Sequence, residues 1–157
     1  MVINWNSPKK DSADSGFFLR KRYNTKMDRK KLLLHSTLLV LFIFFINLVA
    51  LKFYWYYSVW YFDMIMHFLG GFWLGLLFLW ILKIQNVSIN SILKIILSVF
   101  IVGFSWEIFE IIVNNFFAQN PFSFFDTISD LCFDLAGGIF SFFYFYKKIM
   151  INPKNTL

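Results

Sequence analysis

Residues 32–51, LLLHSTLLVLFIFFINLVAL, contain no acid, lysine or arginine. At 1.5 Å per residue, a helix of about 20 residues crosses the ~30 Å hydrocarbon core of a bilayer. Comparable apolar stretches follow at 64–82, 92–115 and 127–146. The sequence therefore predicts an all-α integral membrane protein, with a bundle of four transmembrane helices over 32–146.

The composition agrees with a membrane location. Of the 157 residues, 59% are hydrophobic and 23% are aromatic, whereas soluble domains are about 45–50% apolar. We expect a multi-pass protein of the cell membrane, with membrane lipids as its surroundings.

Basic residues are concentrated at the start of the chain. The formal net charge is +6, and nine of the fifteen Lys and Arg residues fall within residues 1–31. Nucleic-acid binding is one interpretation of such a run. Beside a membrane segment we favour a cytoplasmic tail that is attracted to anionic lipid, and we expect no nucleic-acid partner. Residues 147–157 are expected to form a second, short cytoplasmic tail.

The remaining positive charges predict the direction of the helices. Apart from Lys52, they flank the connection between the second and third spans or follow the fourth span: Lys83, Lys94, Lys147, Lys148 and Lys154. Because Lys and Arg favour the cytoplasmic side, both termini are predicted to be cytoplasmic. The aromatic stretch 53–62, FYWYYSVWYF, then forms a belt at the outer interface.

Ionisable residues fall in the outer halves of three predicted spans. They are His67 in the second span with Asp63 just before it, Glu107 and Glu110 in the third, and Asp130 and Asp134 in the fourth with Asp126 just before it. Within each span they recur every three or four residues, which places them on one helix face. An aspartate at the centre of a membrane helix costs about 2.5–3.5 kcal/mol to insert. If the three faces turn inward, the helices form one polar site, as helix bundles do when they hold metals.

No nearby lysine or arginine balances this charge, except that Lys52 could pair with one surface acid. The alternatives are shared protons, a bound cation or a cationic ligand. Histidine with carboxylates suits a divalent Mg²⁺, Mn²⁺ or Zn²⁺ ion. The candidate metal ligands are His67, Glu107, Asp130, Asp134, Asp63 and Asp126.

Several of these residues also have an ordinary structural interpretation. Asp63 and Asp126 each precede a predicted span and could be helix N-caps. Glu110 could face an aqueous vestibule, and His67 could be a buried histidine with satisfied hydrogen bonds. Glu107, Asp130 and Asp134 have the weakest structural explanation, because they lie deepest.

Other polar and small residues are assigned to packing. His35, Asn47 and Asn114 could form hydrogen bonds between helices, and Cys132, which faces away from the aspartates, is expected to be a buried, inert thiol. Two pairs of small residues at a spacing of four predict close helix contacts: Gly71 with Gly75, and Gly137 with Ser141.

The segments DMIMHFLGGFWLG, GFSWEIFE and DTISDLCFDLAGG resemble the motifs of small VanZ-like and YjdF-type bacterial membrane proteins. The resemblance covers about residues 63–141. It implies that the motif positions are Asp63, His67, Glu107, Glu110, Asp126, Asp130 and Asp134. It also implies a role at the cell envelope, without naming a reaction.

Three functional hypotheses remain open. The first is a metal-dependent enzyme acting on a lipid or lipid-linked substrate, with Glu107, Glu110, Asp130 and Asp134 as catalytic candidates and Glu110 as general base. The second is a cation- or proton-coupled transporter or binding protein, for which a homo-oligomer could supply the pathway. The third is a scaffold without catalysis, in which protonated carboxyls tie the helices together.

Overall fold

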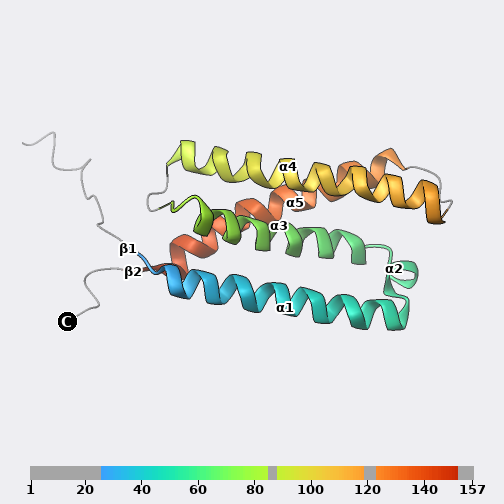
Figure 1. Ribbon diagram of the computed structural model, residues 1–157, viewed down its shortest axis with the longest axis horizontal. Coiled ribbons are helices and arrows are strands. Elements are labelled where there is room, and N and C mark those ends of the chain that lie inside the picture. Colours follow the sequence, from blue (N-terminus) through green and yellow to red (C-terminus); the bar gives the residue numbers. More distant parts are fainter. Residues whose placement is uncertain (1–25, 85–87, 119–122, 152–157) are drawn as a thin grey trace, which may run out of the picture.

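The computed structural model describes residues 26–84, 88–118 and 123–151. Four long helices dominate this part of the chain, and all four are long and apolar enough to span a membrane (Figure 1). The elements are β1 (Lys26–Met27), α1 (Arg29–Phe53), α2 (Trp55–Ser58), α3 (Phe62–Ile81), α4 (Ile89–Val113), the π-helical segment η2 (Asn114–Ala118), α5 (Phe124–Tyr144), the π-helical segment η3 (Phe145–Ile149) and β2 (Met150–Ile151). The predicted four-helix architecture is confirmed, and each long helix lies within a few residues of its predicted span.

Helix α3 lies at the centre of the bundle. It packs most extensively on α5 and also contacts α1 and α4, which lie on either side of it (Figure 1). By contrast, α1 and α4 make almost no contact with each other. The bundle therefore has a gap between α1 and α4, over the surface of α3.

Helix boundaries follow local capping. Asp28 precedes α1 and its carboxylate accepts a hydrogen bond from the backbone N–H of Lys31 at 3.1 Å. At the other end of α1, Tyr54 adopts a left-handed conformation with φ of 56°. This residue ends the helix and turns the chain into α2, which lies within the aromatic stretch 53–62.

The two ends of the described chain meet. Strand β1 pairs with β2 in antiparallel fashion, with Met27 opposite Met150. The start and the end of the described chain therefore lie at the same end of the bundle, and α2 lies at the opposite end (Figure 1). Most of the predicted N-terminal tail lies outside the described residues.

The apolar core occupies the half of the bundle near these chain ends. Its fully buried residues include Leu76 and Leu79 of α3, Ile95 and Val99 of α4, and Phe145 after α5. Large apolar side chains also cover the outside of the bundle, for example Leu38 and Phe45, which are 56% and 65% exposed. An apolar exterior of this kind suits a lipid environment.

Cys132 lies on this exterior and is exposed. The prediction that its thiol faces away from the aspartates is confirmed, and the prediction that it is buried is wrong. In a membrane protein the face turned away from the bundle meets lipid, which is as apolar as a protein core. An apolar environment therefore does not require burial inside the protein.

Candidate functional site

The polar faces of α3, α4 and α5 meet inside the bundle. His67, Glu107, Asp130 and Asp134 are buried, with exposures of 8%, 3%, 2% and 5%. We call these four residues the buried cluster. The sequence prediction that three helices turn their ionisable residues toward one another is confirmed for them.

His67 connects the helices of the cluster. Its Nε2 atom lies 3.9 Å from Oδ1 of Asp63 and 3.9 Å from Oε1 of Glu107. Its Nδ1 atom lies 3.5 Å from Oδ2 of Asp134. The two ring nitrogens therefore face different carboxylates, with Asp134 on one side and Asp63 and Glu107 on the other.

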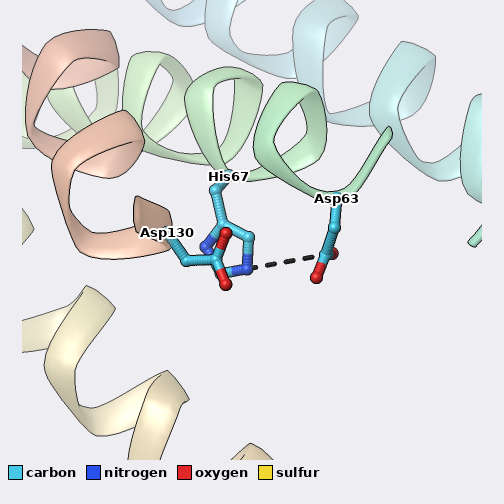
Figure 2. Close-up of side chains that lie close together, drawn as sticks. All are labelled: Asp63, His67 and Asp130. Carbon is cyan, nitrogen blue, oxygen red and sulfur yellow. Dashed lines mark ion pairs between the residues drawn. The ribbon is translucent and has the colours of Figure 1, made fainter. Parts of the chain in front are cut away.

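Two sets of side chains have the spacing of a metal site. Asp63, His67 and Asp130 each offer one ligand atom, and these atoms lie within 4.8 Å of one another. Figure 2 shows the carboxylates of Asp63 and Asp130 near the imidazole ring of His67. Glu107 and Glu110 form a second such set, again with His67. His67 belongs to both sets and is the natural centre of the site.

Two buried carboxylate oxygens have no hydrogen-bond partner among the described residues. They are Oε1 of Glu107 and Oδ1 of Asp130. Buried polar atoms are nearly always paired with protein, water or an ion, so each of these oxygens calls for a partner. Within the described part of the chain, every ion pair that the acids of the site make is with His67.

Close helix packing brings the cluster together. A side chain at Gly71 of α3 would collide with the backbone of Asp134 of α5, and one at Gly137 of α5 would collide with the backbone of Phe68. Gly75 similarly lies against Ser141. The predicted role of both small-residue pairs is confirmed, because α3 and α5 could not approach so closely with larger residues.

Gly103 of α4 was not singled out from the sequence. A Cβ atom at this position would lie 2.5 Å from Oδ2 of Asp134. The absence of a side chain therefore leaves room for the Asp134 carboxylate between α4 and α5. The sequence did contain a signal for this role, because Gly103 lies one turn before Glu107 on the same helix face.

Asp63, Glu110 and Asp126 lie at the margin of the site. The side chain of Asp63 is 33% exposed, Glu110 is half-buried, and Asp126 is exposed. Asp126 belongs to neither set of metal-spaced residues. Of the predicted site residues, it alone is both exposed and outside the two metal-spaced sets.

The N-cap interpretation of two aspartates is wrong. The residue before α3 is Tyr61, and Asp63 lies in the first turn. The residue before α5 is Ser123, whose hydroxyl accepts from the backbone N–H of Asp126 at 3.4 Å. Both aspartates instead lie where a negative charge is stabilised by the positive end of the helix dipole.

Of the polar residues expected to form hydrogen bonds between helices, Asn47 does so, whereas the prediction for His35 is wrong. Nδ1 of His35 lies 2.6 Å from the carbonyl oxygen of Lys31 within α1, so this contact is local and does not join two helices. Asn47 accepts a hydrogen bond from the hydroxyl of Tyr56 at 2.8 Å. Burial and the nearby Asp63 and Glu110 carboxylates raise the pKa of Tyr56. Its hydroxyl therefore stays protonated and acts as a donor.

A cavity of about 430 Å³ opens from the cluster into the gap between α1 and α4. Its polar lining consists of Asn47, Tyr56, Asp63, His67 and Asp134. The remaining lining is apolar apart from two glycines, and comes from α1, α3 and α4. The volume is within the range of about 300–1,000 Å³ that small-molecule sites occupy. Neither Tyr56 nor the cavity could be identified from the sequence.

Comparison with known proteins gives one family. Neither the curated proteins nor the solved structures contain a match to this chain. Residues 21–149 match the family described as "Predicted membrane protein (DUF2238)". The matched range includes all four long helices and every residue of the buried cluster. The chain therefore belongs to the DUF2238 family of membrane proteins.

Proposed function

We propose that the buried cluster binds a divalent metal ion, and that the protein is a membrane-embedded, metal-dependent enzyme acting on a lipid or lipid-linked substrate. The observation that carries this proposal is the pair of buried carboxylate oxygens without a partner, on Glu107 and Asp130. They flank a histidine that also lies within a buried site. A divalent ion held beside His67 would supply a partner for a carboxylate oxygen of this kind.

The geometry suggests different roles for the acids. His67 would be the shared ligand, Asp63 and Asp130 would join it from one metal-spaced set and Glu107 from the other, and such ligands suit Mg²⁺, Mn²⁺ or Zn²⁺. Asp134 faces Nδ1 of His67. A carboxylate in that position usually orients a metal-binding histidine, and we assign Asp134 this role in place of direct ligation.

A bound ion would polarise a phosphoryl or carbonyl group of the substrate, or activate a water molecule. Glu110 is half-buried and close to His67 and Glu107, so it can accept a proton from the attacking water or hydroxyl. Among the described residues no lysine or arginine lines the cavity. The negative charge of a phosphate would therefore have to be balanced by the ion.

The resemblance to VanZ-like and YjdF-type proteins supports a role at the cell envelope. The motif positions that it implies coincide with the buried cluster and its margin. A lipid or lipid-linked envelope component is accordingly the substrate class that we propose.

Reconstitution in vesicles of a total bacterial lipid extract tests this function. The purified protein is incubated with Mg²⁺, Mn²⁺ or Zn²⁺, and the lipids are then profiled by mass spectrometry. We expect a lipid to be converted by the native protein with metal, but not by a Glu107→Gln variant. An identified conversion that continues at full rate in this variant would refute the catalytic assignment.

A cation- or proton-coupled transporter is the second candidate. Its support is the depth of the acids inside the bundle, since intramembrane carboxylates often mark ion pathways. The apolar core in the other half of the bundle counts against a pathway through a single chain. Cation flux into proteoliposomes that disappears in Glu107→Gln would favour transport over lipid chemistry.

A further inference from the structure

The cavity changes from polar to apolar along the helix axes. On α3 its lining runs from Asp63 and His67 to Trp73 and Leu74. On α1 it runs from Asn47 to Val40, in the same direction. From His67 to Leu74 this is a distance of about 10 Å at 1.5 Å per residue. The polar end points to the membrane surface that carries α2, and the apolar end points to the middle of the membrane.

A membrane lipid has the same polarity. Its headgroup lies at the surface and its hydrocarbon chains extend to the bilayer centre. The cavity lies between two predicted membrane-spanning helices, α1 and α4, that make almost no contact with each other. A lipid can therefore enter sideways from the bilayer, without passing through water.

Gly70 provides an independent observation. It lines the cavity, and a Cβ atom added to it would meet nothing within 4 Å. The neighbouring Gly71, by contrast, is required by its contact with α5. Glycine inside a helix is less favourable than alanine. Because helix packing does not require glycine at position 70, the residue is better explained by the space that it keeps open.

We infer that this cavity binds one hydrocarbon chain of a membrane phospholipid, with the headgroup beside His67, and that Gly70 sets the space available to the chain. Val40, Leu74 and Val102 line the apolar part, one from each of three helices. Two buried side chains, His67 and Asp134, line the polar part. The identification of this lipid as a substrate rests on the proposed function, whereas the binding of its hydrocarbon chain does not.

Photocrosslinking tests the inference. The full-length protein is reconstituted in phosphatidylethanolamine–phosphatidylglycerol vesicles that contain phosphatidylglycerol with a diazirine in the middle of one acyl chain. After illumination, the labelled positions are mapped by mass spectrometry. We expect preferential labelling of Val40 and Leu74 over Leu38 and Phe45, which lie on the exterior. Equal labelling of the two groups would overturn the inference.

A matched pair of variants sharpens the test. Gly70→Leu fills the cavity and introduces a good helix former, so we expect labelling inside the cavity to fall roughly tenfold. Ala136→Leu adds the same side chain at an exposed position of α5 outside the cavity, and labelling should be unchanged. Unchanged labelling in Gly70→Leu would contradict the role of Gly70.

The metal content of the same samples separates this inference from the proposed function. If the native protein labels inside the cavity but proves to contain no metal, the result would support the binding of a hydrocarbon chain and remove support for the metal enzyme. Bound metal without cavity labelling would leave the metal site standing and overturn the lipid-chain site.

Discussion

Nδ1 of His67 lies 3.5 Å from Oδ2 of Asp134, on the side of the imidazole ring opposite the Glu107 carboxylate. This arrangement joins α3 to α5 and fixes which ring nitrogen faces the proposed ligand set. It resembles the carboxylate–histidine pairs that orient metal ligands in many proteins.

Asp134→Asn tests this orienting role. The amide keeps the shape of the side chain but is a weaker acceptor, so we expect metal affinity to fall by about 10- to 100-fold without complete loss of binding. Titration of metal-free protein by calorimetry measures the change. Asp126→Asn is the matched control, because Asp126 is exposed and outside both metal-spaced sets, and the metal affinity of this variant should fall far less than that of Asp134→Asn. Equal affinities in both variants would argue against the orienting role.

The close contact between α3 and α5 predicts that substitutions at two adjacent glycines differ strongly in their effect on stability. Gly71→Ala places a methyl group against the Asp134 backbone and should lower the free energy of unfolding by about 1–3 kcal/mol. Gly70→Ala, where the added methyl meets open space, should leave stability unchanged or raise it slightly. Thermal unfolding in detergent compares the two. Equal destabilisation would show that α3 and α5 do not pack as described.

The hydrogen bond between Tyr56 and Asn47 joins α2 to α1 at the mouth of the cavity. Tyr56→Phe removes this 2.8 Å bond and should cost about 0.5–1.5 kcal/mol of stability. Tyr57→Phe makes the same chemical change at a residue that is 85% exposed, and we expect little effect there. Unfolding midpoints of the two variants provide the comparison; a larger loss in Tyr57→Phe would contradict this assignment.

The predicted direction of the helices can be tested by cysteine labelling. In a Cys132→Ala background, Ser58→Cys places a thiol at the end of α2, and Ser88→Cys places one just before α4. Because these exposed positions lie at opposite ends of the bundle, a membrane-impermeant reagent should reach only one of them in intact cells. The distribution of lysines predicts that this one is Ser58→Cys. Labelling of Ser88→Cys alone would reverse the predicted topology.

Much of this fold could be predicted from residue type and spacing. Twenty apolar residues in a row define a span, and spacings of three or four, as in His67 with Asp63 or Asp130 with Asp134, define a helix face. The inward direction of those faces followed from the cost of exposing carboxylates to lipid.

The remaining features depend on how each helix is rotated against its neighbours. Apolar side chains face both the core and the lipid, so the sequence could not reveal that Cys132 is exposed. For the same reason the sequence could not reveal that Gly70 borders a cavity, although the spacing of Gly71 and Gly75 did indicate the contact with α5. The Tyr56–Asn47 bond depends on the turn at Tyr54, whose left-handed conformation no sequence pattern indicated.

Metal content by mass spectrometry of the purified protein tests the central claim most directly. The native protein is compared with a Glu107→Gln/Asp130→Asn double variant, which alters both buried carboxylates that lack a partner, and with Asp126→Asn as control. Elution as a single species and an unfolding transition establish that each variant is folded. We predict about one divalent ion per chain in the native protein and in Asp126→Asn, and none in the folded double variant. Native protein without metal, even after purification in the presence of Mg²⁺, Mn²⁺ and Zn²⁺, would contradict the proposed metal site.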